Sequence, residues 1–295
     1  MKERCYAKIN LSLNVKSVRE DGYHELEMIM VPIDFYDMLE MVPAEETTLS
    51  NNRNYLPVNE KNTVIKAIRT MQKKYGITQE FACTLQKHIP TRAGLAGGSA
   101  DGAAVIRMMN KMCHLHMTQE EMISIAKEVG SDVPFCVVSK PAFVTGTGEF
   151  LDPFHVNTDF EVLLVKPKRG VSTKEAFELC DSTDPVHPDC YKMREALETN
   201  DYKSVLNNLG NSLEDAALQL CPEIAQVKKA LEALGFDGVL MSGSGSTVFG
   251  ITKNKSLVDK ASDLLKDKKL FVRKTRILGA VKLDEAIQKN STKII

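Results

Sequence analysis

Residues Gln86–Ala104 read QKHIPTRAGLAGGSADGAA. Four glycine or serine residues fall within the eight positions Gly94–Asp101, and an amphipathic run through Ala103–Met117 follows them. This pattern predicts a loop that leads into a helix. Unhindered backbone N–H groups in such a loop can converge on an anion, and the positive end of the helix adds to the attraction. The predicted ligand is a phosphate group.

A simple reversal of the chain is the alternative role for this loop. A tight turn needs one or two glycines, whereas Gly94, Gly97 and Gly98 are spread over five positions, with Ser99 directly after them. Phosphate binding is therefore favoured. Two common nucleotide motifs are excluded, because no Lys-Ser or Lys-Thr pair follows the last glycine and the spacing is not G-x-G-x-x-G.

The bulk composition is that of a globular protein with one large or two medium domains. The chain has 295 residues, of which 43% are hydrophobic and 26% charged, and a net charge of −1. This charge gives no reason to expect nucleic acid or an anionic membrane as a partner. No apolar run approaches membrane-spanning length and no signal peptide is apparent, so we expect a cytoplasmic protein. The oligomeric state cannot be read from these features.

The seven cysteines are odd in number and form no C-x-x-C pair, which predicts reduced thiols. Cys113, His114 and His116 could form one corner of a metal site. Zinc sites usually use two spaced ligand pairs, and no second pair is apparent, so this interpretation is disfavoured.

The segment Tyr6–Val15 alternates apolar and polar residues with a period of two, which predicts a strand. Its polar face carries Lys8 and Asn10, and a solvent-exposed polar face is the alternative to a functional one. An Asp-Gly turn then precedes Tyr23 and His24, two rings that suit a nucleobase. For Tyr23 the alternative is a rim residue that packs on the core.

Residues 59–75 have apolar side chains at helical spacing, with Asn62 or Thr63 as the expected N-cap. The following strand, Phe81–Leu85, would deliver Lys87 to the mouth of the glycine-rich loop. A cation there would favour a polyphosphate, although Lys87 could equally be solvated surface.

Asp132 lies between the end of a helix predicted at Thr118–Val129 and an apolar segment, Phe135–Val138, that we expect to be a strand. Such a carboxylate can orient and deprotonate an alcohol when a cation such as Lys8 balances the charge. The alternative is a turn-forming aspartate before Pro134.

The remaining segments give weaker expectations. Glu27–Glu40 should form two strand pieces broken by Pro32, and a second unit should begin near residue 155. The expected helices are Leu206–Leu220, Pro222–Leu234 and Ser256–Leu265, and strands should flank a Gly/Ser loop within Gly238–Gly250. A strand is expected at Val272–Leu278, and a frayed tail after Asp284.

Four short motifs, in this order, resemble those of the GHMP kinase superfamily. They are A-K-I-N-L at residues 7–11 with D-G-Y-H at 21–24, P-x-x-x-G-L-x-G-G-S at 90–99, G-S-D-V-P-F at 130–135 and M-S-G-S-G-S at 241–246. The branch that they resemble is the 4-diphosphocytidyl-2-C-methyl-D-erythritol kinases. The implied fold is α+β with two lobes: an N-terminal lobe similar to ribosomal protein S5 domain 2, at residues 1–155, and a C-terminal α/β-sandwich lobe at residues 156–295.

The resemblance implies ATP-dependent phosphorylation of a hydroxyl of 4-diphosphocytidyl-2-C-methyl-D-erythritol, in non-mevalonate isoprenoid synthesis, with Mg²⁺ bridging the phosphates. It implies Asp132 as base and Lys8 as its partner. The implied ATP-binding residues are Asn62, Lys87, Pro90, Gly94, Leu95, Ala96, Gly97, Gly98 and Ser99. The implied substrate-binding residues are Asn10, Tyr23, His24, Phe177, Ser244 and Gly245, with Phe177 facing Tyr23 across the cytosine, although a core role for Phe177 is open.

Three residues depart from the pattern of this branch. Ala96 stands where glycine is common, Ala100 where a second serine is common, and Gly102 where alanine is common. Arg92 is larger than the usual residue and could contact phosphate or point to solvent. Two other functions therefore remain open: a GHMP kinase for another small alcohol, and a catalytically silent nucleotide-binding paralogue. No protein ligand for Mg²⁺ is predicted.

Overall fold

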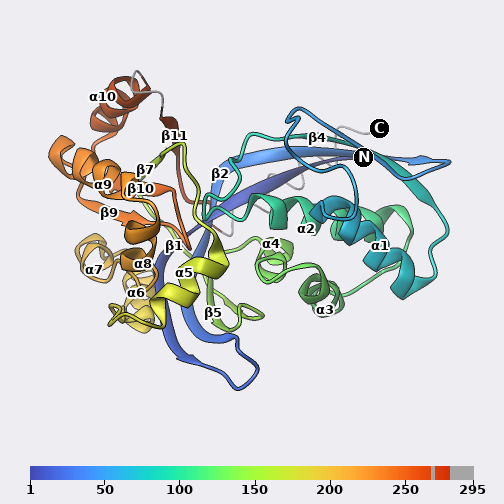
Figure 1. Cartoon of the computed structure of the whole chain (residues 1–295), viewed down its shortest axis with the longest axis horizontal. Coiled ribbons are helices and arrows are strands. Elements are labelled where there is room, and N and C mark those ends of the chain that lie inside the picture. Colours follow the sequence, from blue (N-terminus) through green and yellow to red (C-terminus); the bar gives the residue numbers. More distant parts are fainter. Residues whose placement is uncertain (267–269, 280–295) are drawn as a thin grey trace. The chain divides into compact units, whose positions relative to one another are not determined.

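The structure is a computed structural model, and it describes residues 1–266 and 270–279 (Figure 1). The chain forms two compact units, each assembled from three segments. The first unit contains Met1–Ala7, Phe35–Thr91 and Ala96–Ser139, and the second contains Lys8–Asp34, Arg92–Leu95 and the chain from Lys140 onward. The lobe boundary near residue 155 stays a prediction, and the tail after Asp284 lies outside the described residues.

The first unit combines strands with a helical layer. Its strands are the start of β1 (Lys2–Val18), the end of β2 (His24–Ala44), β3 (Thr48–Asn51) and β4 (Glu80–Gln86), and its helices are α1 (Thr63–Tyr75), α2 (Gly97–Met112), α3 (Gln119–Val129) and α4 (Val133–Val138). Strand β4 runs antiparallel to β2 and parallel to β3. Helix α1 begins where the Asn62 side chain accepts from the Val64 N–H and ends at Gly76, whose φ is 64°. Both caps agree with the sequence prediction.

The second unit contains a separate four-stranded antiparallel sheet in the order β11-β7-β10-β9. Its strands are β7 (Glu161–Lys166), β9 (Gly238–Met241), β10 (Val248–Thr252) and β11 (Phe271–Thr275), and the unit's helices are α5 (Thr173–Cys180), α6 (Cys190–Glu198), α7 (Tyr202–Asn207), α8 (Glu214–Leu220), α9 (Glu223–Leu234) and α10 (Lys255–Lys266). The strands β5 (Ala142–Gly146) and β6 (Phe150–Pro153) pair with each other, and β5 pairs with the start of β2. The short β8 (Gly210–Asn211) pairs in parallel with β1 (Lys2–Val18).

The predicted strand at Tyr6–Val15 is confirmed as part of β1, but its polar face is not exposed. Lys8 is 4% exposed and Asn10 is fully buried. A buried ammonium group requires hydrogen-bonding partners, so the polar face of this strand is an internal feature of the protein.

The break predicted at Pro32 is wrong, because β2 continues through it. The pairing of β2 with β5 covers Leu26–Met30, and the pairing with β4 begins at Met38. Pro32 lies between these two ladders, so its missing N–H removes no hydrogen bond from either.

Two further predictions are corrected. Residues 133–138 form helix α4 and not a strand; a short apolar run is compatible with either, and Pro134 suits the first helical turn. The single helix predicted at Leu206–Leu220 is two helices, α7 and α8, with β8 between them. Here the pairing of Gly210 and Asn211 with β1 overrides the local helical pattern.

Among the described residues, no helix combines the length and the apolar character needed to cross a bilayer.

Candidate functional site

The glycine-rich loop enters helix α2 without a side-chain cap. Ala96 occupies the N-cap position with φ at 55°, in the left-handed region, and its side chain makes no capping hydrogen bond. A Cβ on Gly97 would lie 2.8 Å from Ile89 Cγ2 and 3.1 Å from Lys87 Nζ, so only glycine fits there. The first turn of α2 therefore has backbone N–H groups with no capping side chain, which is the arrangement that binds anions.

The left-handed conformation at position 96 explains why glycine is the usual residue there. A non-glycine residue in this region costs about 1–2 kcal/mol, because its Cβ approaches the following carbonyl oxygen. Ala96 thus keeps the path of the loop at the expense of local strain.

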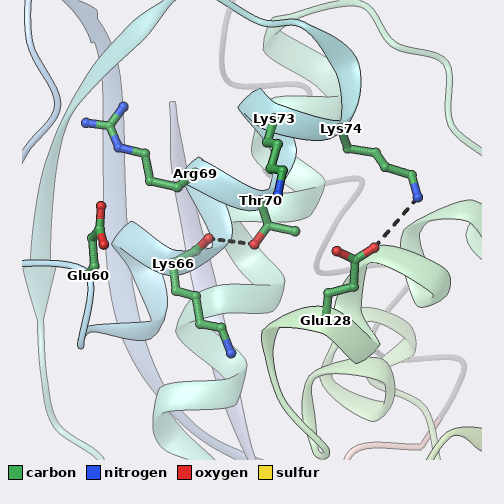
Figure 2. Close-up of a pocket in the computed structure, with 7 residues that line it drawn as sticks. All are labelled: Glu60, Lys66, Arg69, Thr70, Lys73, Lys74 and Glu128. Carbon is green, nitrogen blue, oxygen red and sulfur yellow. Dashed lines mark hydrogen bonds and ion pairs between the residues drawn. The ribbon is translucent and has the colours of Figure 1, made fainter.

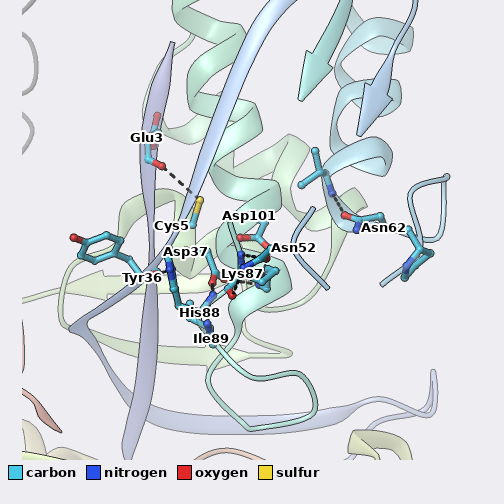
Figure 3. Close-up of polar contacts among 12 residues, drawn as sticks. Glu3, Cys5, Tyr36, Asp37, Asn52, Asn62, Lys87, His88, Ile89 and Asp101 are labelled. Carbon is cyan, nitrogen blue, oxygen red and sulfur yellow. Dashed lines mark hydrogen bonds and ion pairs between the residues drawn. The ribbon is translucent and has the colours of Figure 1, made fainter. Parts of the chain in front are cut away.

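A buried charged cluster lies against this first turn (Figure 3). Lys87 Nζ donates to Asp37 Oδ2 and, at 2.7 Å, to Asp101 Oδ2. All three side chains are at least 96% buried. The interpretation of Lys87 as solvated surface is therefore wrong, while its contact with ATP stays a prediction.

Asp37 also fixes the backbone that leads into the loop. Its Oδ1 accepts from the N–H groups of His88, at 2.5 Å, and Ile89, at 2.8 Å. The Asn52 side chain holds the backbone N–H and C=O of Lys87, at 2.8 and 3.3 Å. These contacts fix the main chain of residues 87–89 directly before the predicted phosphate-binding segment.

Burial and the neighbouring charges both shift pKa values within this cluster. Burial raises the pKa of Asp101, and the Asp37 charge adds to this against the opposing effect of Lys87, which leaves the pKa at about 7. For Lys87, burial lowers the pKa, but the Asp101 and Asp37 carboxylates outweigh it, so the pKa is raised. Lys87 is therefore a cation in this cluster at neutral pH.

Helix α1 contacts the same turn of α2 through Thr63. A Cβ on Gly98 would lie 3.2 Å from Thr63 Oγ1, and a Cβ on Gly102 would lie 2.8 Å from Thr63 Cγ2. The departure at Gly102, where alanine is usual, is thus explained by the methyl group of Thr63.

This contact predicts a coupled effect on stability. In a Thr63→Ser background, we expect Gly102→Ala to raise the free energy of unfolding by about 0.5–1 kcal/mol, because alanine is the better helix former. In the wild-type background the same change should lower it by about 1 kcal/mol, because the two methyl groups collide. Chemical denaturation of the four proteins measures the coupling, and strictly additive effects would contradict it.

Asn62 has a structural role that the sequence anticipated. Its Oδ1 caps α1 by accepting from the Val64 N–H at 3.0 Å, and its Nδ2 donates to the Pro57 carbonyl at 2.8 Å. The predicted contact with adenine stays a prediction.

In the second unit, the loop between β9 and β10 packs against Gly94. The Ser242 hydroxyl donates to the Gly94 carbonyl at 3.0 Å and accepts from the Asn10 N–H at 3.4 Å. The buried Asn211 side chain donates to the carbonyls of Met241, at 2.9 Å, and Gly243, at 2.8 Å. Residues from three of the predicted motifs are thereby brought together.

Lys8 lies within this group. Its Nζ donates to Asn10 Oδ1 at 2.6 Å, and it would be 3.2 Å from a Cβ on Gly243. The backbone N–H of Lys8 donates to the Leu95 carbonyl at 3.2 Å. A buried ammonium group is therefore held beside both the glycine-rich loop segment 92–95 and the fourth motif, residues 241–246.

Helix α5 and its C-cap residue carry three relevant side chains at i, i+4 and i+8, spacings that share one helix face. The Thr173 hydroxyl is 2.9 Å from the Ser244 hydroxyl. The rings of Phe177 and His24 are 4.6 Å apart with an interplanar angle of 33°. His24 Nε2 is 2.7 Å from Asp181 Oδ1.

The sequence prediction paired Phe177 with Tyr23, and the structure places His24 against the Phe177 ring. Tyr23 itself is 61% exposed. The role of Phe177 and Tyr23 as faces of a cytosine site stays a prediction, and His24 now has a defined partner in Asp181.

Asp132 belongs to the first unit and Lys8 to the second. Asp132 is half-buried and directly precedes helix α4, which its side chain does not cap. Its role as base stays a prediction.

A separate cavity of about 620 Å³ lies along α1 (Figure 2). It is lined by Glu60, Lys66, Arg69, Thr70, Lys73, Lys74 and Glu128. Two of its cations have partners of their own: Lys66 Nζ donates to the Val129 carbonyl at 2.8 Å, and Lys74 Nζ is 3.7 Å from Glu128. This cavity contains none of the predicted site residues, and its lining is typical of a solvated charged surface.

Within the described part of the chain, no group of three or more His, Cys, Asp or Glu side chains could hold a metal ion.

Sequence reasoning missed Asp37, Asn211 and Asp181. Asp37 and Lys87 are 50 positions apart, and Asn211 is 30 positions from Met241. Each acts through a partner distant in sequence, so no local pattern around it signals its role.

Two family models match the chain: GHMP kinases N terminal domain at residues 62–140 and GHMP kinases C terminal at residues 193–268. A Bacillus pumilus protein named 4-diphosphocytidyl-2-C-methyl-D-erythritol kinase is 40% identical over 260 residues, covering 88% of this chain and 90% of the relative. A protein of the same name from Bacillus cytotoxicus is 40% identical over 276 residues, covering 92% and 95%.

Solved structures give the same result. A crystal structure of 4-(cytidine 5'-diphospho)-2C-methyl-D-erythritol kinase matches with a TM-score of 0.76 and 29% identity, covering 93% of this chain and 99% of that one. A crystal structure of L. major mevalonate kinase matches with a TM-score of 0.70 at 17% identity, covering 95% of this chain and 96% of that one, which is a likeness of fold. The predicted mixture of helices and strands in a two-domain fold is confirmed.

Proposed function

Because the chain belongs to the GHMP kinase family, we propose that it transfers a phosphoryl group from ATP to a hydroxyl of 4-diphosphocytidyl-2-C-methyl-D-erythritol. The observation that carries the proposal is its similarity, over about nine-tenths of the chain, to relatives of that name. The proposed partners are ATP and this small substrate, and the proposed location is the cytoplasm.

The reaction needs a phosphate site, a base and a charge partner. In the proposal, the backbone N–H groups at the start of α2 hold the ATP phosphates. Asp132 accepts the proton of the substrate hydroxyl while the hydroxyl oxygen bonds to the γ-phosphorus, and the bond from that phosphorus to the β,γ-bridging oxygen breaks to release ADP. Lys8, fixed by Asn10, stabilises the negative charge that develops.

Mg²⁺ is proposed as the companion of ATP. The described residues contain no cluster of three or more His, Cys, Asp or Glu side chains that would form a metal cage. This fits an ion that is held mainly by phosphate oxygens and water, as Mg²⁺ commonly is in kinases, and the ion would neutralise phosphate charge.

The cytidine end is proposed to lie at His24 and α5. An ionised Asp181 can only accept, so Nε2 of His24 must donate to it, and Nδ1 of the neutral ring is then an acceptor. An acceptor suits the exocyclic amino group of cytosine and not the carbonyl oxygen that uracil has at the same position.

Replacing Asp181 by Asn tests this tautomer argument. An amide can donate or accept, so the His24 tautomer is no longer fixed, and we expect discrimination between cytidine and uridine forms of the substrate to fall by about tenfold. The ratio of kcat/KM for the two acceptors measures this. Asp184→Asn, an exposed neighbour, should leave the ratio unchanged; an equal fall in both variants would contradict the argument.

The proposed reaction is tested by phosphoryl transfer from ATP to cytidine-containing and cytidine-free alcohols. We expect transfer to 4-diphosphocytidyl-2-C-methyl-D-erythritol to exceed that to other acceptors. Transfer confined to a cytidine-free alcohol would favour another GHMP kinase activity. Nucleotide binding without transfer to any acceptor would favour a catalytically silent paralogue.

A further inference from the structure

The cluster of Asp37, Lys87 and Asp101 has an unusual charge balance for a phosphate site (Figure 3). It contains two carboxyl groups and one ammonium group, all buried. The ammonium would be 3.1 Å from a Cβ on Gly97, so the cluster lies directly against the first turn of α2. If both carboxyls are ionised, the cluster carries a net negative charge beside the proposed site of a polyanion.

The hydrogen bonds indicate which carboxyl is ionised. Asp37 accepts from three donors: the N–H groups of His88 and Ile89 and the ammonium of Lys87. Three donors stabilise the carboxylate form. Asp101 accepts from Lys87 through Oδ2, while its buried Oδ1 has no hydrogen-bond partner among the described residues. Asp101 is therefore the carboxyl group that can take up a proton at least cost.

Within the part of the chain that the structure describes, Lys87 is the cation that pairs with Asp101. Besides Lys87 and Asp37, the fully buried thiol of Cys5 on β1 is affected by its charge. On β1 and farther along α2, Glu3 and Arg107 form an ion pair with each other. Helix α1 presents the Thr63 hydroxyl and methyl groups to α2, and α4 consists of uncharged residues.

We propose that Asp101 takes up one proton from solvent when nucleotide phosphates bind at the N–H groups of Gly97–Ser99, and that it thereby sets the nucleotide affinity. Protonation leaves a neutral Asp101 beside a balanced Asp37–Lys87 pair, so the phosphates no longer face net negative charge. The inference rests on the proposed function for the identity of the ligand. Asp101 acts through the charge and position of Lys87 and α2.

The direction of the pH dependence follows from the ionisation of Asp101 in the protein without nucleotide. Burial raises the pKa of Asp101 to about 7, so a substantial fraction is ionised just above neutral pH. Bound phosphates raise this pKa further, which means that affinity is highest below pH 7 and weakens as pH rises through the free pKa. A one-proton linkage weakens the affinity by at most about tenfold per pH unit, until the pKa of the complex is passed.

The test is calorimetric titration of the full chain with the non-hydrolysable analogue β,γ-imido-ATP, without acceptor, just above neutral pH. Repeating it in buffers with different ionisation enthalpies gives the number of protons taken up. We expect wild type to take up a larger fraction of a proton than Asp101→Asn, whose amide oxygen can still accept from Lys87. The ionisation of the analogue itself is common to both titrations and cancels in the difference.

Two comparisons make the result specific. Asp101→Asn should bind the analogue several-fold more tightly than wild type above neutral pH, with a flatter pH profile. Asp263→Asn removes one exposed negative charge on α10 and should behave as wild type. Equal proton uptake by wild type and Asp101→Asn would overturn the inference while leaving the proposed function intact. Failure of every variant and of wild type to bind nucleotide would overturn both.

A measurement on wild type alone tests the inference even if Asp101→Asn does not fold. Infrared difference spectra should show the carbonyl band of a protonated carboxylic acid growing when the analogue is added just above neutral pH. Nucleotide binding without such a band would contradict the inference.

Discussion

Asp132→Asn is expected to lower kcat for phosphoryl transfer by about 10²–10⁴-fold, the usual contribution of a general base. An amide has nearly the shape of the carboxyl group but cannot accept the hydroxyl proton. Asp132 does not cap α4, so the change removes no helix cap. Single-turnover kinetics, nucleotide affinity and thermal unfolding together separate loss of chemistry from loss of fold.

Ser131→Ala is the matched control, because Ser131 is the exposed neighbour of Asp132. We expect it to retain wild-type kcat. A double variant of Asp132→Asn with Lys8→Met should be little slower than the slower single variant, because residues that act as a unit have non-additive effects on catalysis. Wild-type kcat in Asp132→Asn would refute its role as base, and multiplied losses in the double variant would refute joint action with Lys8.

The helices that were predicted correctly have their capping residues directly before or after them in the sequence. Helix α3 has a capping box between Thr118 and Glu121, and α1 has Asn62 before it and Gly76 after it. These signals lie within a few residues of the helix that they define. A single sequence is therefore enough to find them.

Two of the segments that were predicted incorrectly depend on distant partners. Pro32 is tolerated because two different strands pair with β2 on either side of it. Asn211 leaves the helical pattern because it pairs with Leu13 of β1 and holds the loop after β9. No pattern within either segment contains this information.

In the candidate site too, some residues can be identified from the local sequence and others only from the structure. The residues at Gly94–Ser99, Lys8 and Ser242 belong to motifs that are recognisable as short strings. Asp37 has no such motif, although it fixes the backbone before the loop. The unusual Gly102 could be noticed in the sequence, but only the position of Thr63 explains it.

Gly94→Ala is expected to lower the free energy of unfolding by about 3 kcal/mol or more, the sum of two costs. The φ angle of Gly94 is 71°, in the left-handed region, which costs any other residue about 1–2 kcal/mol. In addition, the new Cβ would lie 1.9 Å from the Ser242 carbonyl oxygen, which is backbone and cannot rotate away. Chemical denaturation followed by circular dichroism measures the loss.

Gly22→Ala separates the two costs. Gly22 has a similar φ of 81°, but a Cβ there would meet nothing within 4 Å, so only the conformational cost of about 1–2 kcal/mol applies. The excess loss in Gly94→Ala therefore measures the close approach of Gly94 to the loop between β9 and β10. Because Ser242 also holds the Gly94 carbonyl, displacement of that loop should disturb Lys8 as well, through its proximity to Gly243. Equal losses in the two variants would show that the loop yields without cost, and that Gly94 is required only for its backbone conformation.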